Sequence, residues 1–195
     1  MPRRPDPFLE DQILNAAAEL WRKGGDNALT MRAVAQAAHT TTPTIYRRFK
    51  NREEILRALL RRIQQDLLNV LQTCRSPEEA SQRYVQFALS HPYEYELSFT
   101  HESAFSYVDH QGRSRPARSK RPEVKLMKAK LAEWLGGSAN DYERLAVVFW
   151  ALNHGTSMLL ISKSARNDIS SKLLRSCVAA VMVLVKNAHA FVTAR

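Results

Sequence analysis

Residues 39–54 read HTTTPTIYRRFKNREE and combine consecutive threonines, a proline and a cluster of basic side chains. Thr41 is predicted to cap a short helix, because its hydroxyl can accept from a free backbone N–H and Pro43 fits the first turn. Proline also disfavours helical geometry in the preceding residue, so Thr42 is the alternative cap. Ile45 and Phe49 lie four positions apart, which predicts one apolar face that packs on the protein.

The flanking sequence predicts helices on both sides of this stretch. Apolar residues recur at helical spacing from residue 7 to 23, and the glycines of KGGDN (23–27) are expected to end that helix. Thr30 is expected to cap a second helix over 31–38, and Asn51 with Glu54 predicts a long helix to about Cys74. Two short helices with a tight connection and a supporting helix are typical of a helix-turn-helix DNA-binding domain.

The second short helix has the side chains that DNA contacts require. Short hydroxyl side chains near its start can reach base edges, so Thr42 and Thr44 are expected to face the bases. The hydroxyl of Tyr46 and the nearby positive charges are suited to phosphates. The alternative is that the basic residues are ordinary solvated side chains and that Tyr46 packs against the protein. The candidate DNA-binding residues are Thr30, Arg32, Thr41, Thr42, Thr44, Tyr46, Arg47, Arg48, Lys50 and Arg52.

Residues 13–56, ILNAAAELWRKGGDNALTMRAVAQAAHTTTPTIYRRFKNREEIL, resemble the DNA-binding domain of TetR-type transcriptional regulators. The resemblance rests on Ala35 and Ala38, the hydroxyl of Thr41, the segment IYRRF (45–49) and the acidic helix start at 51–54. The family usually has glycine at the turn where this chain has His39. A left-handed backbone costs histidine about 1 kcal/mol more than glycine, although histidine is among the residues that tolerate it best.

The resemblance implies an all-α protein of about nine helices in two domains. Residues 1–55 would form the helix-turn-helix DNA-binding domain, and residues 56–195 a helical bundle for ligand binding and dimerisation. The implied function is that of a regulator, in the usual case a repressor released from a palindromic operator by a small-molecule inducer. The alternative is a non-specific or architectural DNA-binding protein without an inducer.

Helix signals continue through the rest of the chain. Ser76-Pro77 predicts a helix to about His91, followed by a short helix to about residue 100. The basic segment 109–122 is expected to be a mobile loop, with helices over 123–135, 142–162 and 169–192 after it. The segment WALNHG (150–155) resembles the Trp-x-x-x-His-Gly pattern of one C-terminal class of TetR-type regulators.

The last two predicted long helices are apolar around more than one stripe, whereas a surface helix needs only one. The second stripe is expected to pack against the same helices of a second subunit, with Val181 and Val185 in the interface. The alternative is that these helices lie at the centre of a monomer's own core.

An inducer pocket is expected among the middle helices, because aromatic side chains are concentrated there. Each of these aromatic residues could instead belong to the core. The candidates are Tyr84, Phe87, Tyr93, Phe99, Phe105, Trp134, Phe149 and Trp150.

The positive charge of the chain favours nucleic acid or another polyanion as the partner, and the resemblance implies that this partner is double-stranded DNA. Lys and Arg outnumber Asp and Glu by 29 to 19, a formal charge of +10. Cys74 and Cys177 have no metal-binding spacing, and neither a metal nor a cofactor is expected. The longest apolar run, 177–185, is shorter than the ~20 residues a bilayer requires, so a cytoplasmic protein is expected. The chain has no glycine-rich phosphate loop, HExxH or nucleophile elbow, so it is not expected to be an enzyme.

Overall fold

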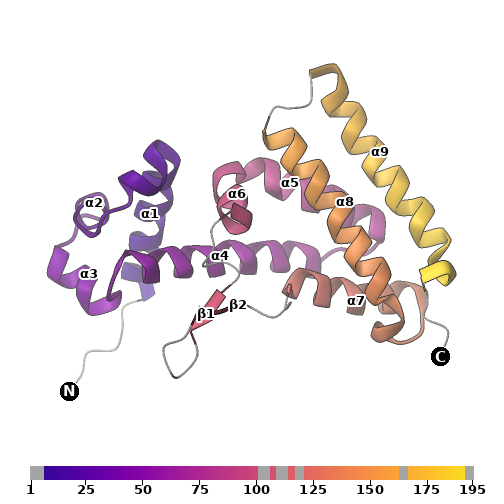
Figure 1. Ribbon diagram of the computed structural model, residues 1–195, viewed down its shortest axis with the longest axis horizontal. Helices are drawn as coiled ribbons and strands as arrows, with labels where there is room; N and C mark the ends of the chain where they lie inside the picture. Colours follow the sequence, from indigo (N-terminus) through magenta and orange to yellow (C-terminus); the bar gives the residue numbers. More distant parts are fainter. Residues whose placement is uncertain (1–6, 101–105, 109–113, 117–120, 163–166, 192–195) are drawn as a thin grey trace. The chain divides into compact units, whose positions relative to one another are not determined.

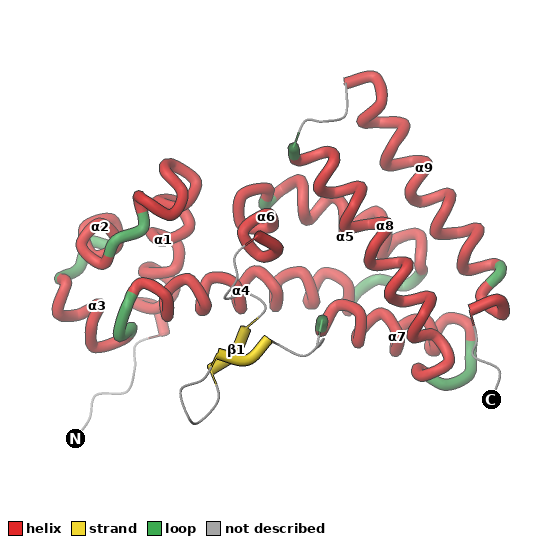
Figure 2. Tube along the Cα trace, in the orientation of Figure 1, coloured by secondary structure: helices red, strands yellow, loops and turns green. Residues whose placement is uncertain are grey.

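A computed structural model describes residues 7–100, 106–108, 114–116, 121–162 and 167–191. This part of the chain is almost entirely helical, which confirms the all-α fold class (Figures 1 and 2). The first six helices are α1 (Pro7–Ala28), α2 (Met31–Ala37), α3 (Thr42–Arg48), α4 (Arg52–Gln72), α5 (Pro77–Ser90) and α6 (Pro92–Thr100). The later ones are α7 (Pro122–Leu135), α8 (Glu143–Ile161) and α9 (Asn167–Lys186), with short 3₁₀ helices at Ala139–Tyr142 and Ala188–Phe191.

The chain divides into two compact units. The N-terminal unit consists of residues 1–64 and 93–104, and the C-terminal unit consists of residues 65–92 and 105–195. The first unit extends past residue 55 because the apolar side chains of α4 continue its core through Leu60. It also includes α6, whose Leu97 is 2% exposed within the same core.

Local sequence signals determine where the helices of the N-terminal unit begin and end. Gly24 and Gly25 have non-helical backbone angles within α1, and Gly25 has φ +58°, which confirms the expected break there. Thr30 caps α2 by accepting the Ala33 N–H at 3.1 Å. His39 has φ +50°, so it adopts the left-handed conformation expected at the turn. Asn51 accepts the Glu54 N–H at 3.0 Å where α4 begins.

The core of the N-terminal unit joins α1, α2, α3, α4 and α6. Arg22 of α1 forms an ion pair with Glu94 of α6, with Nε and Oε1 3.2 Å apart. Glu94 is only 7% exposed, and the positive charge of Arg22 offsets the cost of burying this carboxylate. The fully buried side chains of the core are Ile13, Ala17, Leu29, Val34, Ile45, Ile55, Leu56 and Leu59.

The C-terminal unit is held together by α5, α8 and α9, which pack on one another, and by α7, which packs on α8 (Figure 1). Asn153 lies at the centre of these contacts and is fully buried. Its Oδ1 accepts the hydroxyl of Ser81 from α5 at 2.6 Å and lies 3.7 Å from the thiol of Cys177 on α9. Its side-chain amide donates to the carbonyl of Phe149 at 2.8 Å. One amide therefore connects three helices, and its removal would leave buried partners unsatisfied.

Part of the segment expected to be a loop is instead paired backbone. Strand β1 (Ser106–Val108) pairs antiparallel with β2 (Ser114–Pro116), and Tyr107 lies opposite Arg115. The loop prediction is therefore wrong for residues 114–116. The sequence of β2 has no apolar alternation, and main-chain pairing in so short a hairpin does not require one.

Candidate nucleic-acid interface

The start of α3 has three side chains joined by hydrogen bonds. The Thr41 hydroxyl accepts the Thr44 N–H at 3.4 Å, which confirms Thr41 as the cap. The hydroxyl oxygens of Thr41 and Thr44 lie 2.9 Å apart, and the Arg47 guanidinium donates to Thr44 Oγ1 at 3.0 Å. This network orders polar groups at the N-terminal end of the helix.

The two sides of α3 differ sharply in exposure. Ile45 is fully buried and Phe49 is 6% exposed, whereas Tyr46 is 54% exposed. Thr41 and Arg47 are also exposed, and Thr42 and Thr44 are half-buried. The helix thus packs by its apolar side and presents hydroxyl, phenol and guanidinium groups to solvent. Such a set can donate to and accept from base edges and can donate to phosphates.

Two arginines predicted to contact phosphates form ion pairs within the N-terminal unit. Arg48 pairs with Glu10 of α1. Arg52 pairs with Asp26, with Nη1 2.9 Å from Oδ2, and donates to the Asp26 carbonyl at 2.9 Å. Both side chains help join α1 to the helices that follow. To reach a phosphate, each would exchange a carboxylate for it.

The other predicted DNA-binding residues have different surroundings. Arg32 and Lys50 are exposed, and the Lys50 backbone N–H donates to Glu54 Oε2 at 2.7 Å. Thr30 uses its hydroxyl as the α2 cap. The structure therefore brings the predicted residues onto α2, α3 and the start of α4 within one unit.

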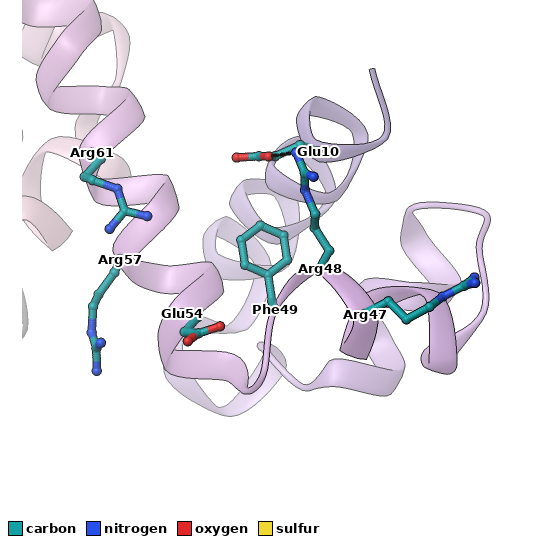
Figure 3. A pocket seen from close by; sticks show the side chains of 7 residues that line it. All are labelled: Glu10, Arg47, Arg48, Phe49, Glu54, Arg57 and Arg61. Atoms are coloured by element: carbon teal, nitrogen blue, oxygen red, sulfur yellow. Dashed lines mark hydrogen bonds and ion pairs between the residues drawn. The ribbon is translucent and has the colours of Figure 1, made fainter. Parts of the chain in front are cut away.

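A polar pocket of about 470 Å³ lies beside α3, with Phe49 in its lining. Arg57 and Arg61 line it from α4, and the Glu10–Arg48 pair lies beyond the Phe49 ring (Figure 3). Arg47 and Glu54 complete the lining. Sequence reasoning did not select Arg57, Arg61 or Glu10. The spacing of Arg57 and Arg61 by four residues was the available signal, because it places both on one side of a helix.

The predicted inducer-pocket residues occupy different places. Tyr84, Phe87 and Phe149 are 1%, 7% and 2% exposed in the core of the C-terminal unit, whereas Tyr93 is 52% exposed in the N-terminal unit. Phe99 belongs to the N-terminal unit, and Trp134 and Trp150 belong to the C-terminal unit. Phe105 lies outside the described residues. The predicted pocket residues are therefore divided between the two units.

A cluster of aromatic and charged groups joins α7 and α8. The rings of Trp150 and His154 stack with centroids 5.2 Å apart, and the Arg121 guanidinium lies 4.1 Å from the Trp150 ring centroid. Burial lowers the pKa of His154 below its ordinary 6.5, and the positive charge of Arg121 lowers this pKa further. The indole Nε1 of Trp134 is buried and has no hydrogen-bond partner among the described residues.

The side chains of α8 and α9 show which faces remain open. Val181 and Val185 are 1% and 7% exposed in the single chain, so the prediction that they face a second subunit is wrong. They pack inward because α9 covers α5 and α8 with this side. The exposed apolar positions are instead Val147 at 45%, Leu159 at 47% and Val183 at 60%.

The described residues give little support to a membrane span and none to a metal site. One segment, Ala139–Ile161, is long and apolar enough to cross a membrane by length and composition, which is weak support for a span. No group of three or more His, Cys, Asp or Glu side chains in the described part could hold a metal ion. Cys74 and Cys177 are buried and free, and burial raises the pKa of the Cys74 thiol.

Comparison with known proteins identifies the N-terminal part of the chain. Residues 13–59 match the family model of bacterial regulatory proteins of the tetR family. No curated protein matches the sequence significantly.

Solved structures match nearly the whole length of the chain. A TetR-like transcriptional regulator from Rhodococcus sp. RHA1 is 18% identical with a TM-score of 0.61, covering 93% of this chain and 99% of that one. A TetR-family regulator from Haemophilus influenzae is 19% identical with a TM-score of 0.59, and the coverages are 91% and 98%. A TetR variant from Acinetobacter baumannii in complex with minocycline is 14% identical with a TM-score of 0.60, and the coverages are 93% and 97%.

The fold and the α2–α3 geometry define an all-helical protein with an N-terminal helix-turn-helix domain. The chain has the fold of TetR-family transcriptional regulators, and residues 13–59, which include α2 and α3, match the tetR family model.

Proposed function

We propose that the protein is a DNA-binding transcriptional regulator. Specifically, it is a repressor that a small-molecule inducer releases from a palindromic operator. It acts as a regulator and not as an enzyme, and it works in the cytoplasm. The helix-turn-helix domain reads the operator, and the remaining helices bind the inducer and dimerise. The Trp-x-x-x-His-Gly resemblance favours one C-terminal class of these regulators.

The observation that supports DNA reading is the division of α3 into a buried apolar side and an exposed polar side. Ile45 and Phe49 fix the helix on the core, and Thr42, Thr44 and Tyr46 lie on the half-buried or open side. In this proposal the threonines contact base edges and Tyr46 contacts a phosphate. Arg32, Arg47 and Lys50 supply further phosphate contacts from exposed positions.

The proposed dimer uses the outer sides of α8 and α9. Val147, Leu159 and Val183 are large apolar side chains that remain more than two fifths exposed in the single chain. A four-helix contact across a two-fold axis would cover them. It would also place two copies of α3 on one duplex, as reading of a palindrome requires.

The proposed inducer binds in the C-terminal unit near Trp134 and Trp150. The buried Trp134 Nε1 is a donor without a hydrogen-bond partner in the described structure, so an acceptor on a ligand would satisfy it. The stacked Trp150 and His154 rings of α8, the helix on which α7 packs, offer an aromatic surface. A ligand can lower DNA affinity only by its preference for a state in which the two α3 helices fit the duplex less well.

The test is selection of DNA fragments from a genomic pool by the purified full-length protein. Enrichment of a palindromic sequence, with half-sites about 34 Å apart, is expected. Binding to that sequence should exceed binding to random DNA by a factor of roughly 10³ or more at physiological salt. Equal affinity for all fragments would instead support the alternative, a non-specific or architectural DNA-binding protein.

A second experiment tests the inducer. Small, largely apolar compounds are screened by thermal shift, and those that stabilise the protein are added to the operator complex. At least one should lower operator affinity. If every stabilising compound leaves operator binding unchanged, the inducer part of the proposal is wrong and DNA reading is unaffected.

A further inference from the structure

The polar pocket beside α3 has more positive charge than its carboxylates can neutralise. Four arginines and two glutamates line it, which leaves a formal charge of +2. Both glutamates are engaged inside the N-terminal unit. Glu10 pairs with Arg48, and Glu54 accepts the backbone N–H of Lys50 at 2.7 Å.

Arg57 and Arg61 provide the uncompensated charge. Arg57 contacts Glu53 only at 3.7 Å, and the side chains of this pair are 37% and 31% exposed. Exposed pairs of this kind contribute between about 0 and 1 kcal/mol. Arg61 is exposed and has no hydrogen bond or ion pair among the described residues. The neighbouring Arg62 differs, because its guanidinium donates to Asn15 at 2.9 Å and so joins α4 to α1.

Arg57 and Arg61 carry the same charge and lie four residues apart on α4. Like charges four residues apart on a helix repel each other and destabilise it. Both side chains leave the same side of α4 and line the pocket, although the Arg57 side chain extends away from Phe49 (Figure 3). An anion between the two guanidinium groups would turn this repulsion into a pair of charge-assisted hydrogen bonds.

We propose that Arg57 and Arg61 of α4 form a phosphate-binding site in the pocket beside the recognition helix. Guanidinium groups match phosphate oxygens in geometry and keep their charge at any physiological pH. The lining is polar and positively charged, unlike the mostly apolar pockets that take drug-like ligands, so this site is separate from the proposed inducer site.

The phosphate has two potential sources that share this chemistry. One is the DNA backbone outside the bases that α3 reads, and this source rests on the proposed DNA-binding function. The geometry favours it, because Arg47 of α3 also lines the pocket and belongs to the same compact unit. The other source is a free phosphate compound, which would bind whether or not the protein binds DNA.

The experiment compares the full-length protein with two variants, R61Q and the double variant R57Q/R61Q. Their affinities for a duplex of about three helical turns are measured at several salt concentrations. In parallel, thermal unfolding is followed with inorganic phosphate and with chloride at equal ionic strength. The control is K23Q, which removes a charge from an exposed position on α1 outside the pocket. Circular dichroism confirms that each variant is folded.

If the DNA backbone is the source, loss of the site in R57Q/R61Q should lower the slope of log affinity against log salt by about 0.9, with R61Q in between and similar losses on operator and random DNA. If a free phosphate compound is the source, inorganic phosphate should raise the melting temperature of wild type and K23Q but not that of R57Q/R61Q. Either result supports the site. Folded variants that match K23Q in both measurements would overturn it.

Failure of this site and failure of the proposed function are distinguishable. A wild-type protein that binds its operator, with variants that match K23Q in salt slope and in phosphate response, refutes the site and leaves the function standing. A wild-type protein without DNA affinity refutes the function, and the phosphate measurement alone then decides the site.

Discussion

The hydroxyl oxygens of Thr41 and Thr44 lie 2.9 Å apart, and Arg47 donates to the Thr44 oxygen at 3.0 Å. The residue that caps α3 is therefore connected to a residue proposed to read bases and to one proposed to hold a phosphate. Substitutions at these positions affect helix stability, sequence preference and electrostatic attraction to different degrees.

Replacing Thr41 by Ala removes the α3 cap. The Thr44 N–H loses its side-chain acceptor and keeps the Thr41 carbonyl at 2.9 Å, and the free energy of unfolding should fall by about 1 kcal/mol. Denaturant titration measures this loss. Thr41→Ser retains a capping hydroxyl and should stay close to wild type, and an equal loss in both variants would mean that the hydroxyl is not what stabilises the helix.

Replacing Thr44 by Ala tests base reading. Affinity for the preferred operator should fall by about 1–2 kcal/mol and affinity for random DNA by much less, because a base-edge contact is lost only where the right base is present. Thr44→Ser keeps the contacts to Thr41 and Arg47 and serves as the control. Equal losses on both DNAs would show that Thr44 serves only to position Arg47.

Replacing Arg52 by Ala tests a phosphate contact made by a residue that already has a partner. Both DNAs should bind more weakly by similar factors, and the salt slope should fall by about 0.9. Asp26→Asn is the matched variant, because it removes the carboxylate charge 2.9 Å from Arg52 while the Asp26 carbonyl contact is kept. It should strengthen binding to both DNAs, and unchanged affinity in both variants would exclude Arg52 from the interface.

The dimer interface is tested on the open side of α9. Val183→Glu should give folded monomers in light scattering, because Val183 is 60% exposed in the single chain. Val181→Glu is the contrasting variant. It places a charge at a position that is 1% exposed and should lower stability by more than about 3 kcal/mol. A stable Val183→Glu dimer would place the interface elsewhere.

His154 predicts an acid-sensitive stability. Its pKa is lowered in the folded state, chiefly by burial, so below about pH 6.5 the unfolded chain binds a proton that the folded chain does not. Stability should therefore fall as the pH drops through this range. Denaturant unfolding between about pH 7.5 and pH 5.5 should show a flatter pH dependence for His154→Gln than for wild type. Removal of the exposed His189 controls for the loss of one histidine, and identical slopes for wild type and His154→Gln would contradict the prediction.

Features that depend on neighbouring residues were predictable from the sequence. The caps at Thr30, Thr41 and Ser76 form as expected, because a hydroxyl and the free N–H it accepts are only three residues apart. The left-handed His39 follows from the turn between two short helices. The fold class follows from such local signals together with helical periodicity.

Features that depend on distant residues were not predictable in the same way. Glu10 and Arg48 are 38 positions apart, and only the packed α1–α3 arrangement brings them together. Periodicity identified two apolar stripes on α9 but gave no means to tell which one faces the chain's own core, so Val181 was assigned to the wrong side. The same limit applies to Arg57 and Arg61, because a sequence shows which charges share a helix face but not which carboxylates lie near them.

The contribution of α6 to the core of the N-terminal unit constrains the order of events during synthesis on the ribosome. Leu97 completes that core and Glu94 pairs with Arg22 of α1, yet both are made more than thirty residues after Leu60, the last α4 residue of the core. A nascent chain that ends before α6 contains the whole helix-turn-helix sequence and still leaves the Arg22 guanidinium without its buried carboxylate. The protein therefore acquires a finished N-terminal unit only after α5 and α6 have left the exit tunnel, so that a prematurely terminated product lacks part of the core that holds α3 in place.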